Sequence, residues 1–213
     1  MSKNKSQIIT EEMLCMLREN INKHISGHRF SHTLSVEKEI IKLCHIFSLS
    51  ESETAELRAA ALLHDITKEK SPEEHKKLCM ENGIPFGNDE CESPKVFHAI
   101  TAEAVIKKHF ADYAVESILS PIRYHTTGKE NMTLGEKLLY LADYIEETRK
   151  FPDCELLRKR FYSVLNPADN AHLDKILILS FKMTISNLLE EGARIHPATV
   201  ASYNSLLSNR KEQ

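Results

Sequence analysis

The feature of this sequence that most constrains its fold is a set of helix-start signals spread along the chain. Two capping boxes, in which Glu follows Ser or Thr by three positions, are accompanied by two Ser-Pro pairs that place proline at the first helical position. These signals are Ser50 with Glu53, Thr133 with Glu136, Ser71-Pro72 and Ser93-Pro94. No run alternates apolar and polar residues as a strand would, and no Asn-Gly turn joins two β-branched runs. The pattern therefore predicts an all-α protein.

Apolar residues spaced three and four apart predict where the helices run. A first stripe covers residues 13–25 after Thr10, and a second covers residues 36–47. Further helices are predicted over 50–64, from Ser71 to a stop at Asn82-Gly83, from Ser93, from Thr133, at about 153–165, at 170–191 before Gly192, and from near Pro197. Pro121 interrupts another apolar stretch, where it either kinks that helix or starts a new one with Ser120 as the cap, and we favour the second.

The chain is long enough for one globular domain with a buried core, since 41% of its 213 residues are hydrophobic. Its net charge of −3 gives no basis for a general binder of nucleic acid or anionic membranes. No apolar run approaches the roughly 20 residues that a membrane-spanning helix needs. We therefore expect neither nucleic acid nor a membrane among its partners.

The cysteines and the N-terminal residues indicate the cellular compartment in which the protein is expected. The cysteines are scattered and none forms a CxxC pair, so they predict free thiols in a reducing environment. They are Cys15, Cys44, Cys79, Cys91 and Cys154. The segment MSKNKSQIITEE has no hydrophobic stretch of the kind found in a signal peptide. Together these observations predict a cytoplasmic protein.

The dipeptide His64-Asp65 follows an apolar stretch, where a buried carboxylate costs on the order of several kcal/mol unless a cation or strong donors compensate it. Four other segments also direct an imidazole or a carboxylate towards the expected core, by sharing the helical spacing of apolar neighbours. These residues are His32, His98, His125 and Asp143. A lone histidine on an apolar face is usually a structural core residue. The whole set predicts a metal centre, because imidazole and carboxylate suit iron, manganese, zinc or nickel.

The number of candidate ligands indicates two metal ions. Four of them suffice for one ion: His32, His64, Asp65 and Asp143. His98 and His125 then imply a second ion, with Asp65 placed to bridge the two. Two ions about 3.5–4 Å apart can hold a hydroxide and clamp phosphate oxygens on both sides of an in-line attack. The residues thus predict a phosphohydrolase.

The order of these residues, H…HD…D, resembles the HD-domain metal-dependent phosphohydrolases. A finer match over nearly the whole chain resembles the YqeK-type branch, the symmetrical bis(5'-nucleosyl)-tetraphosphatases that hydrolyse diadenosine tetraphosphate. The match consists of HRFSHT (28–33), LLHDITK (62–68), VFHA (96–99), RYHTTG (123–128), MTLGEKLLYLADYIEETR (132–149) and IHPATVASYN (195–204). The HD pair is specific only to the superfamily, whereas YHTTG, LADYIEETR and the HP-x-T segment are specific to the branch.

The resemblance implies a single domain over residues 1–213 with the fold of an HD-type helical bundle, a core at about 10–192 and a substrate-pocket segment at 193–208. It implies cleavage of diadenosine tetraphosphate into two ADP by a hydroxide activated at a dinuclear centre. Iron is the metal most expected, with manganese, nickel, cobalt and zinc as alternatives. The ligands map onto His32, His64, Asp65, His98, His125 and Asp143. Glu147 stands where the family has proline, a difference at a helix end that changes no ligand.

The resemblance also assigns roles in catalysis, for which Asp65 and Lys68 are the expected residues. Substrate contacts are expected from His32, Lys68, His125, Thr126, Asp143, Arg149, His196, Pro197, Thr199 and Val200. Independently, Lys68 lies one turn after His64, and Arg149 follows the helix of Asp143, so both can reach a phosphate. A solvated lysine, a surface arginine and an ordinary turn at Thr126 are the structural alternatives.

Two other functions remain open. One is a different nucleotide phosphohydrolase of the same superfamily, acting on a monoester or a triphosphate. The other is a non-enzymatic, metal-dependent nucleotide sensor, although a sensor does not need a bridged pair of ions. A small-molecule nucleotide is the expected partner, and a homodimer is left open. His28 and Arg29 are near enough to His32 in sequence to support it.

Overall fold

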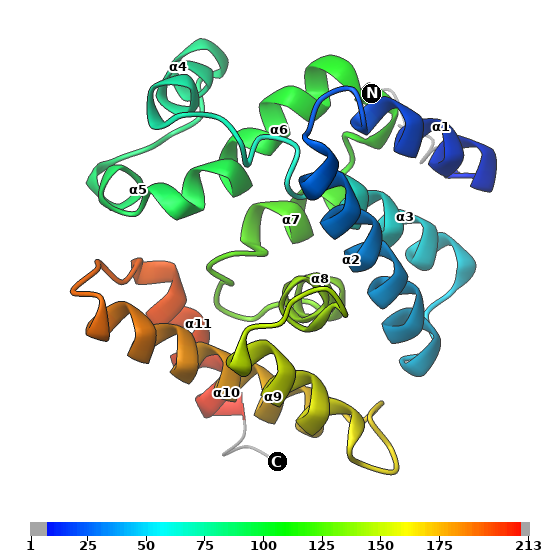
Figure 1. Cartoon of the computed structure of the whole chain (residues 1–213), viewed down its shortest axis with the longest axis vertical. Coiled ribbons are helices and arrows are strands. Elements are labelled where there is room, and N and C mark those ends of the chain that lie inside the picture. The colour runs from blue at the N-terminus through cyan, green and yellow to red at the C-terminus, as the bar shows by residue number, and fades with distance from the viewer. Residues whose placement is uncertain (1–7, 210–213) are drawn as a thin grey trace, which may run out of the picture.

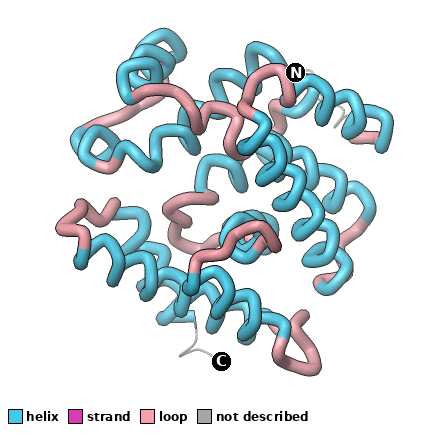
Figure 2. The backbone as a smooth tube through the Cα atoms, viewed as in Figure 1, coloured by secondary structure: helices cyan, strands magenta, loops and turns pink. Residues whose placement is uncertain are grey.

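The computed structural model describes residues 8–209, and within that range every regular element is a helix (Figure 1). Figure 2 shows the helices and the loops that join them, with no strand among the described residues. The all-α prediction is therefore confirmed. The elements are α1 (Glu11–Ile21), α2 (Gly27–Ile46), α3 (Glu51–Leu63), α4 (Pro72–Asn82), α5 (Asn88–Glu92), η1 (Pro94–Val96), α6 (Phe97–His109), η2 (Ala111–Tyr113), α7 (Glu116–Tyr124), α8 (Leu134–Ile145), α9 (Pro152–Tyr162), α10 (Asn170–Glu190) and α11 (Pro197–Asn209), where η marks a short 3-10 helix.

Helix α8 occupies the middle of the molecule (Figure 1). It packs against α2, α3 and α7, and also against α9. Helices α9, α10 and α11 pack on one another in chain order and cover the other side of α8. Helix α6 packs against α4 and α7. The elements that carry the candidate ligands are therefore neighbours, although they are far apart in the sequence.

The core around these helices is apolar and closely packed. In α3, Ala59, Ala60 and Ala61 are fully buried together with Leu63. Alanines at these positions let the neighbouring helices approach α3 closely, because a methyl group is the only side chain between them. Burying one leucine of this kind stabilises the fold by about 1.5–3 kcal/mol. The close approach is what allows polar residues on α2, α7 and α8 to meet near the end of α3.

Most of the expected helix starts are found as predicted. Ser50 with Glu53 and Thr133 with Glu136 form complete capping boxes, in which side chain and backbone bond each other in both directions. Ser71 forms a third box ahead of Pro72. Thr10 caps α1, Ser26 caps α2, and Gly83 ends α4 in the left-handed conformation. These signals are local, since each depends on residues within one turn of the helix end.

Two expectations about proline were wrong. Pro121 lies inside α7 and does not start a new helix. Ser120 is likewise an interior residue of α7 and no cap, and its hydroxyl donates to the Glu136 carboxylate across the contact between α7 and α8. Pro94 starts only η1, with no side-chain bond from Ser93, and α6 begins at Phe97.

Smaller differences concern helix ends and the ends of the chain. Helix α9 ends at Tyr162, earlier than predicted, and α5 was not predicted at all. Residues 1–7, for which the sequence predicts no signal peptide, lie outside the described residues. In the described part of the chain, no helix combines the length and the apolar character that crossing a membrane requires.

We expect Gly128→Ala to destabilise the protein clearly more than Gly83→Ala. Both glycines have positive φ, so alanine is strained at each. At Gly128 a Cβ would also lie 2.5 Å from Ser202 Oγ and 2.8 Å from Phe181 Cζ, whereas at Gly83 it would meet nothing within 4 Å. The extra loss of unfolding free energy at Gly128 should be about 1–3 kcal/mol. Denaturant unfolding of both variants measures it, and equal losses would contradict the packing argument.

Candidate metal centre

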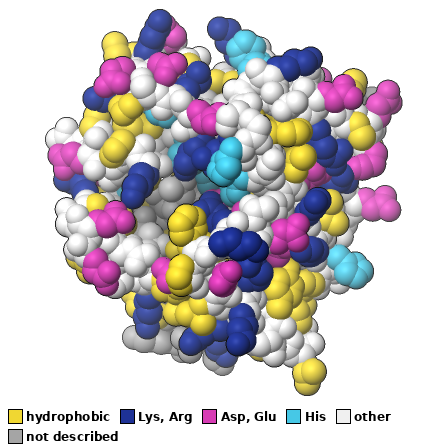
Figure 3. Space-filling view, viewed as in Figure 1, with side chains coloured by type: hydrophobic (Ala, Val, Ile, Leu, Met, Phe, Trp, Pro, Cys, Tyr) yellow, Lys and Arg dark blue, Asp and Glu magenta, His cyan; other side chains and the backbone are white. Residues whose placement is uncertain are grey.

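The six candidate ligands meet at one place in the interior. They are His32 of α2, His64 and Asp65 at the end of α3, His98 of α6, His125 at the end of α7 and Asp143 of α8. All are buried except Asp143, which is partly buried. Figure 3 shows that this face of the molecule is hollowed between the α4–α6 part and the C-terminal helices, with histidine and basic side chains beside the hollow. The centre therefore combines buried ligands with access from solvent.

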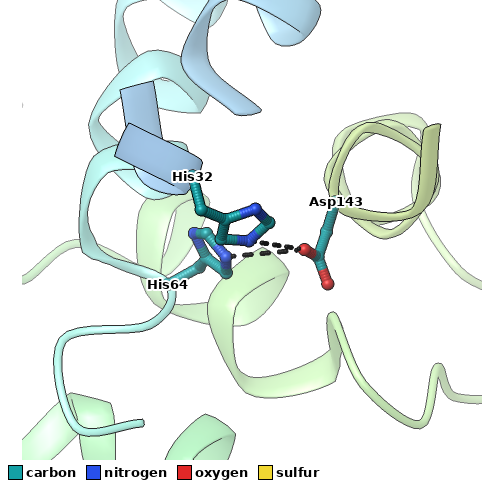
Figure 4. Close-up of side chains that lie close together, drawn as sticks. All are labelled: His32, His64 and Asp143. Carbon is teal, nitrogen blue, oxygen red and sulfur yellow. Dashed lines mark ion pairs between the residues drawn. The ribbon is translucent and has the colours of Figure 1, made fainter. Parts of the chain in front are cut away.

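One end of the centre is formed by His32, His64 and Asp143, whose side chains point towards one another (Figure 4). Asp143 Oδ1 lies 3.0 Å from His32 Nε2 and 3.8 Å from His64 Nε2. Two imidazole nitrogens and a carboxylate oxygen at such distances form a set that could hold one transition-metal ion.

The other end is formed by Asp65, His98 and His125. Asp65 Oδ1 lies 3.2 Å from His98 Nε2 and 3.8 Å from His125 Nε2, and the two imidazole nitrogens are 3.0 Å apart. The second oxygen, Oδ2, lies 3.5 Å from His64 Nε2 and 3.8 Å from His32 Nε2. Asp65 thus stands between the two ends with one oxygen towards each.

Hydrogen bonds on the far side of the rings fix which nitrogen faces the centre. In both His64 and His125, Nδ1 lies 2.6 Å from the backbone carbonyl three residues earlier, that of Ala61 and Ile122 respectively. Each Nδ1 therefore carries the proton and donates it, which leaves Nε2 with a lone pair directed inward. Both histidines are the residues at which a helix ends. The last carbonyls of a helix lack the usual N–H partner four residues further on, so they can accept a side-chain donor.

Glu146 is a residue of the candidate centre that the sequence did not indicate. Its carboxylate is fully buried and lies 3.2 Å from His32 Nδ1, which orients that imidazole. Glu146 also accepts hydrogen bonds from the backbone N–H and the hydroxyl of Thr148. Burial alone would raise the pKa of Glu146, but its hydrogen-bond donors outweigh burial and lower the pKa to about 2. The only signal in the sequence was its position three residues after Asp143.

Two arginines compensate the buried carboxylates. Arg29 Nη1 lies 2.7 Å from Asp65 Oδ2, and Arg149 Nη2 lies 2.6 Å from Asp143 Oδ1. Burial raises the pKa of each aspartate, yet the histidines around Asp65 and the Arg149 guanidinium beside Asp143 hold both pKa values well below the usual range. The carboxylates are therefore ionised, as metal ligands must be. The buried carboxylate of Asp65 is therefore tolerated although it follows an apolar helix.

The histidines differ in protonation. Burial lowers the pKa of His64 to about 4 and that of His98 to about 3, so both rings are neutral at neutral pH. Burial also acts to lower the pKa of His32, but the hydrogen bonds that its ring donates to Asp143 and Glu146 raise the pKa to about 9. Neutral imidazole is the form that binds metal.

The donor atoms fit a metal centre. His64 Nε2 and Asp65 Oδ1 are buried and have no well-directed hydrogen bond among the described residues. Leaving such atoms unpaired costs about 1–3 kcal/mol each, and a bound cation would satisfy both. Imidazole nitrogen and carboxylate oxygen are ligands for divalent transition metals. The residues that carry them could therefore hold a divalent metal.

Two of the predicted phosphate contacts lie at the His98–His125 end. Lys68 Nζ is 3.0 Å from His98 Nε2 and 4.0 Å from Asp65 Oδ1, and burial lowers the pKa of Lys68. Thr126 Oγ1 is 3.3 Å from His125 Nε2. Arg149 lies at the opposite end, on Asp143. The predicted contacts therefore flank the centre on two sides.

Among the described residues, no hydrogen bond or ion pair joins the predicted C-terminal segment to a candidate ligand. His196 Nε2 lies 3.5 Å from Glu90 of α5, and its Nδ1 accepts the N–H of Ala198. Pro197 is the first residue of α11, Thr199 is buried and Val200 is 40% exposed. Helix α11 instead contacts the loop that follows the candidate ligand His125, where the Ser202 hydroxyl donates to the Thr127 carbonyl.

The fold and the site define a helical protein of the HD-domain class. The HD domain family matches residues 29–148, which include all six candidate ligands. A relative from Halalkalibacterium halodurans, the symmetrical bis(5'-nucleosyl)-tetraphosphatase, is 33% identical over 196 residues, or 90% of this chain and 95% of its own length. The enzyme of the same description from Bacillus subtilis is 34% identical over 188 residues, or 88% of this chain and 94% of its own. This chain therefore belongs to the HD-domain family, in the group of these tetraphosphatases.

A solved structure agrees with the assignment. It comes from Clostridium acetobutylicum and is described as a predicted HD superfamily hydrolase involved in NAD metabolism. It is 28% identical in sequence, superposes with a TM-score of 0.80, and the match covers 92% of this chain and 97% of that one. The prediction of an HD-type helical fold is thereby confirmed.

Proposed function

We propose that this protein hydrolyses dinucleoside tetraphosphates at the middle of the polyphosphate, converting diadenosine tetraphosphate into two ADP. The observation that carries the proposal is the meeting of six ligand side chains, with Lys68 on one side and Arg149 on the other. The choice of substrate is supported by the relatives, which are described as symmetrical tetraphosphatases. The match to this chain extends over almost their whole length.

Two metal ions are proposed, with iron favoured by the family resemblance. His32, His64 and Asp143 would hold one, and Asp65 with His98 and His125 the other. When bound, such ions supply a water of lowered pKa as nucleophile and polarise the phosphate oxygens.

The chain's own residues position the substrate and offset its charge. Lys68 and Thr126, beside His98 and His125, would bind the phosphates of one half of the tetraphosphate. Arg149 would bind the phosphates of the other half through its planar, bidentate guanidinium. Charge that develops on the leaving diphosphate is thus met by a fixed cation at either end, without reorganisation during the reaction. Glu146 holds the ring of His32 and so keeps its Nε2 directed at the centre.

The test is a product analysis. The metal-loaded protein is incubated with diadenosine tetraphosphate, and the nucleotides are separated by ion exchange. ADP as the only product supports the proposal, and ATP with AMP contradicts symmetrical cleavage. A parallel incubation with NAD covers the description of the Clostridium relative, because cleavage at the pyrophosphate would release two mononucleotides. No turnover of any nucleotide would favour the sensor.

His196→Ala is expected to weaken substrate binding and leave the chemical step unchanged. If the imidazole contacts the nucleoside, KM for diadenosine tetraphosphate should rise about tenfold while kcat stays within about twofold. A point variant is preferable to removing the segment, because Leu206 of α11 is buried in the core. His172→Ala, a partly buried histidine stacked on Phe161, is the control. A fall in kcat at constant KM would instead place His196 in support of the metal centre.

A further inference from the structure

A pocket of about 580 Å³ opens beside the metal centre at its His32–Asp143 end. It lies between the start of α2 and the segment that joins α8 to α9. Its lining includes His28, Arg29, His32, Arg149, Lys150 and Phe151. Lys68, Thr126, His98 and His125 do not line it. The pocket is therefore separate from the position proposed above for the first half of the substrate, and its volume is in the range of small-molecule sites.

The walls of this pocket are positively charged. Arg29 and Arg149 each use one guanidinium nitrogen to bond an aspartate of the centre, and neither guanidinium has a second partner among the described residues. Lys150 adds a third cation beside them. The one carboxylate in the lining, Glu146, has its oxygens occupied by Thr148 and His32. The pocket thus offers free N–H donors to an anionic ligand at a point that adjoins the reacting centre.

Phe151 gives the pocket an aromatic wall. The chain has eight phenylalanines, all within the described residues, and Phe151 alone is exposed, at 66%. It stands just before α9, and its side chain makes no cap for that helix. An exposed aromatic ring next to cations is the arrangement that binds a nucleobase by stacking while the phosphates pair with the charges.

A dinucleoside tetraphosphate that is cut at its middle bond must place one nucleoside diphosphate on each side of the centre. Lys68 and Thr126 lie at one end of the ligand cluster, and the pocket opens at the other. We propose that the pocket binds the second nucleoside diphosphate of the substrate, with its base on Phe151 and its phosphates on Arg29, Arg149 and Lys150. This inference rests on the proposed function, since only a substrate with two nucleosides needs the second position.

The test compares two substrates that share a tetraphosphate but differ in the number of nucleosides: diadenosine tetraphosphate and adenosine 5'-tetraphosphate. Phe151→Ala in the full, metal-loaded chain should raise KM about tenfold for the dinucleotide. For the mononucleotide KM should stay within about twofold, because its single adenosine can occupy the first position. Phe151→Trp, which retains a ring for stacking, should restore KM for the dinucleotide. Leu165→Ala, an exposed apolar residue that does not line the pocket, should change neither value.

Each outcome decides the inference. A rise confined to the dinucleotide, reversed by Phe151→Trp, supports the second position. No change, or an equal rise for both substrates, overturns it while leaving the proposed function intact. Failure of the unaltered protein to cleave diadenosine tetraphosphate would overturn the proposed function itself, and this result is seen before any variant is made.

Discussion

Asn in place of Asp65 is expected to lower the turnover of diadenosine tetraphosphate by about a thousandfold or more. Asp65 stands between the two ends of the centre, with Oδ1 facing His98 and His125 and Oδ2 facing His64. An amide keeps the shape of the side chain but is a far weaker metal ligand than a carboxylate. The change therefore removes the one group that faces both ends and leaves the packing in place. Steady-state turnover and metal content of the purified variant measure the effect.

Asp174→Asn is the matched control, because Asp174 is also buried and paired with a cation, Lys137, at 2.6 Å. It lies on α10, away from the centre, and its loss should lower stability without lowering turnover. The far-ultraviolet circular dichroism of both variants should match that of the unaltered protein. Activity of Asp65→Asn within about tenfold of the unaltered protein would remove Asp65 from the centre.

The second large effect is expected from His98→Ala, which should lower the bound metal from about two ions per chain to about one. His98 Nε2 lies 3.0 Å from His125 Nε2 and 3.2 Å from Asp65 Oδ1, and the set of His32, His64 and Asp143 does not include it. One ion should therefore remain, while catalysis falls steeply because half of the phosphate clamp is lost. Elemental analysis gives the metal count, and a melting curve gives the stability.

His75→Ala separates this effect from the loss of any buried histidine. His75 is also buried, and its Nδ1 lies 2.8 Å from Thr101 Oγ1 on the same helix that carries His98. Its removal should cost about 1–3 kcal/mol of stability and leave the metal count unchanged. If His98→Ala behaves in the same way, with a lower melting temperature and unchanged metal content, the centre does not contain two ions.

Much of the fold could be predicted because its signals are local. The capping boxes at Ser50 and Thr133 and the stop at Gly83 depend on residues within one helical turn, so the sequence alone reveals them. Pro121 was misjudged because a Ser-Pro pair is locally typical of a helix start, whereas here both residues lie inside α7. Ser120 looks like a cap in the sequence, but its hydroxyl bonds Glu136 on another helix. Short α5 was missed because it has no apolar periodicity to predict it.

The candidate site likewise contains residues that local sequence patterns reveal and residues that only the tertiary structure brings together. The polar residues on apolar stripes could be selected one by one, since helical spacing alone places them on buried faces. Glu146 could not, because its partner His32 is 114 residues away and only the packing of α2 on α8 brings them together. The position of Arg29 on Asp65 depends in the same way on the contact between α2 and α3. Residues that orient the ligands are thus harder to predict than the ligands.

The carbonyl bonds at His64 and His125 have a consequence for which ions the centre accepts. Each ring is locked at a helix end before an ion arrives, so binding does not have to freeze it, which saves up to about 1 kcal/mol of side-chain entropy per imidazole. Ligands that are held in fixed positions cannot move apart or together to suit ions of different size. The centre should therefore discriminate among metals by ionic radius and coordination geometry rather than by adapting to each. The selectivity of the centre for one metal over another thus depends on the positions at which α3 and α7 end.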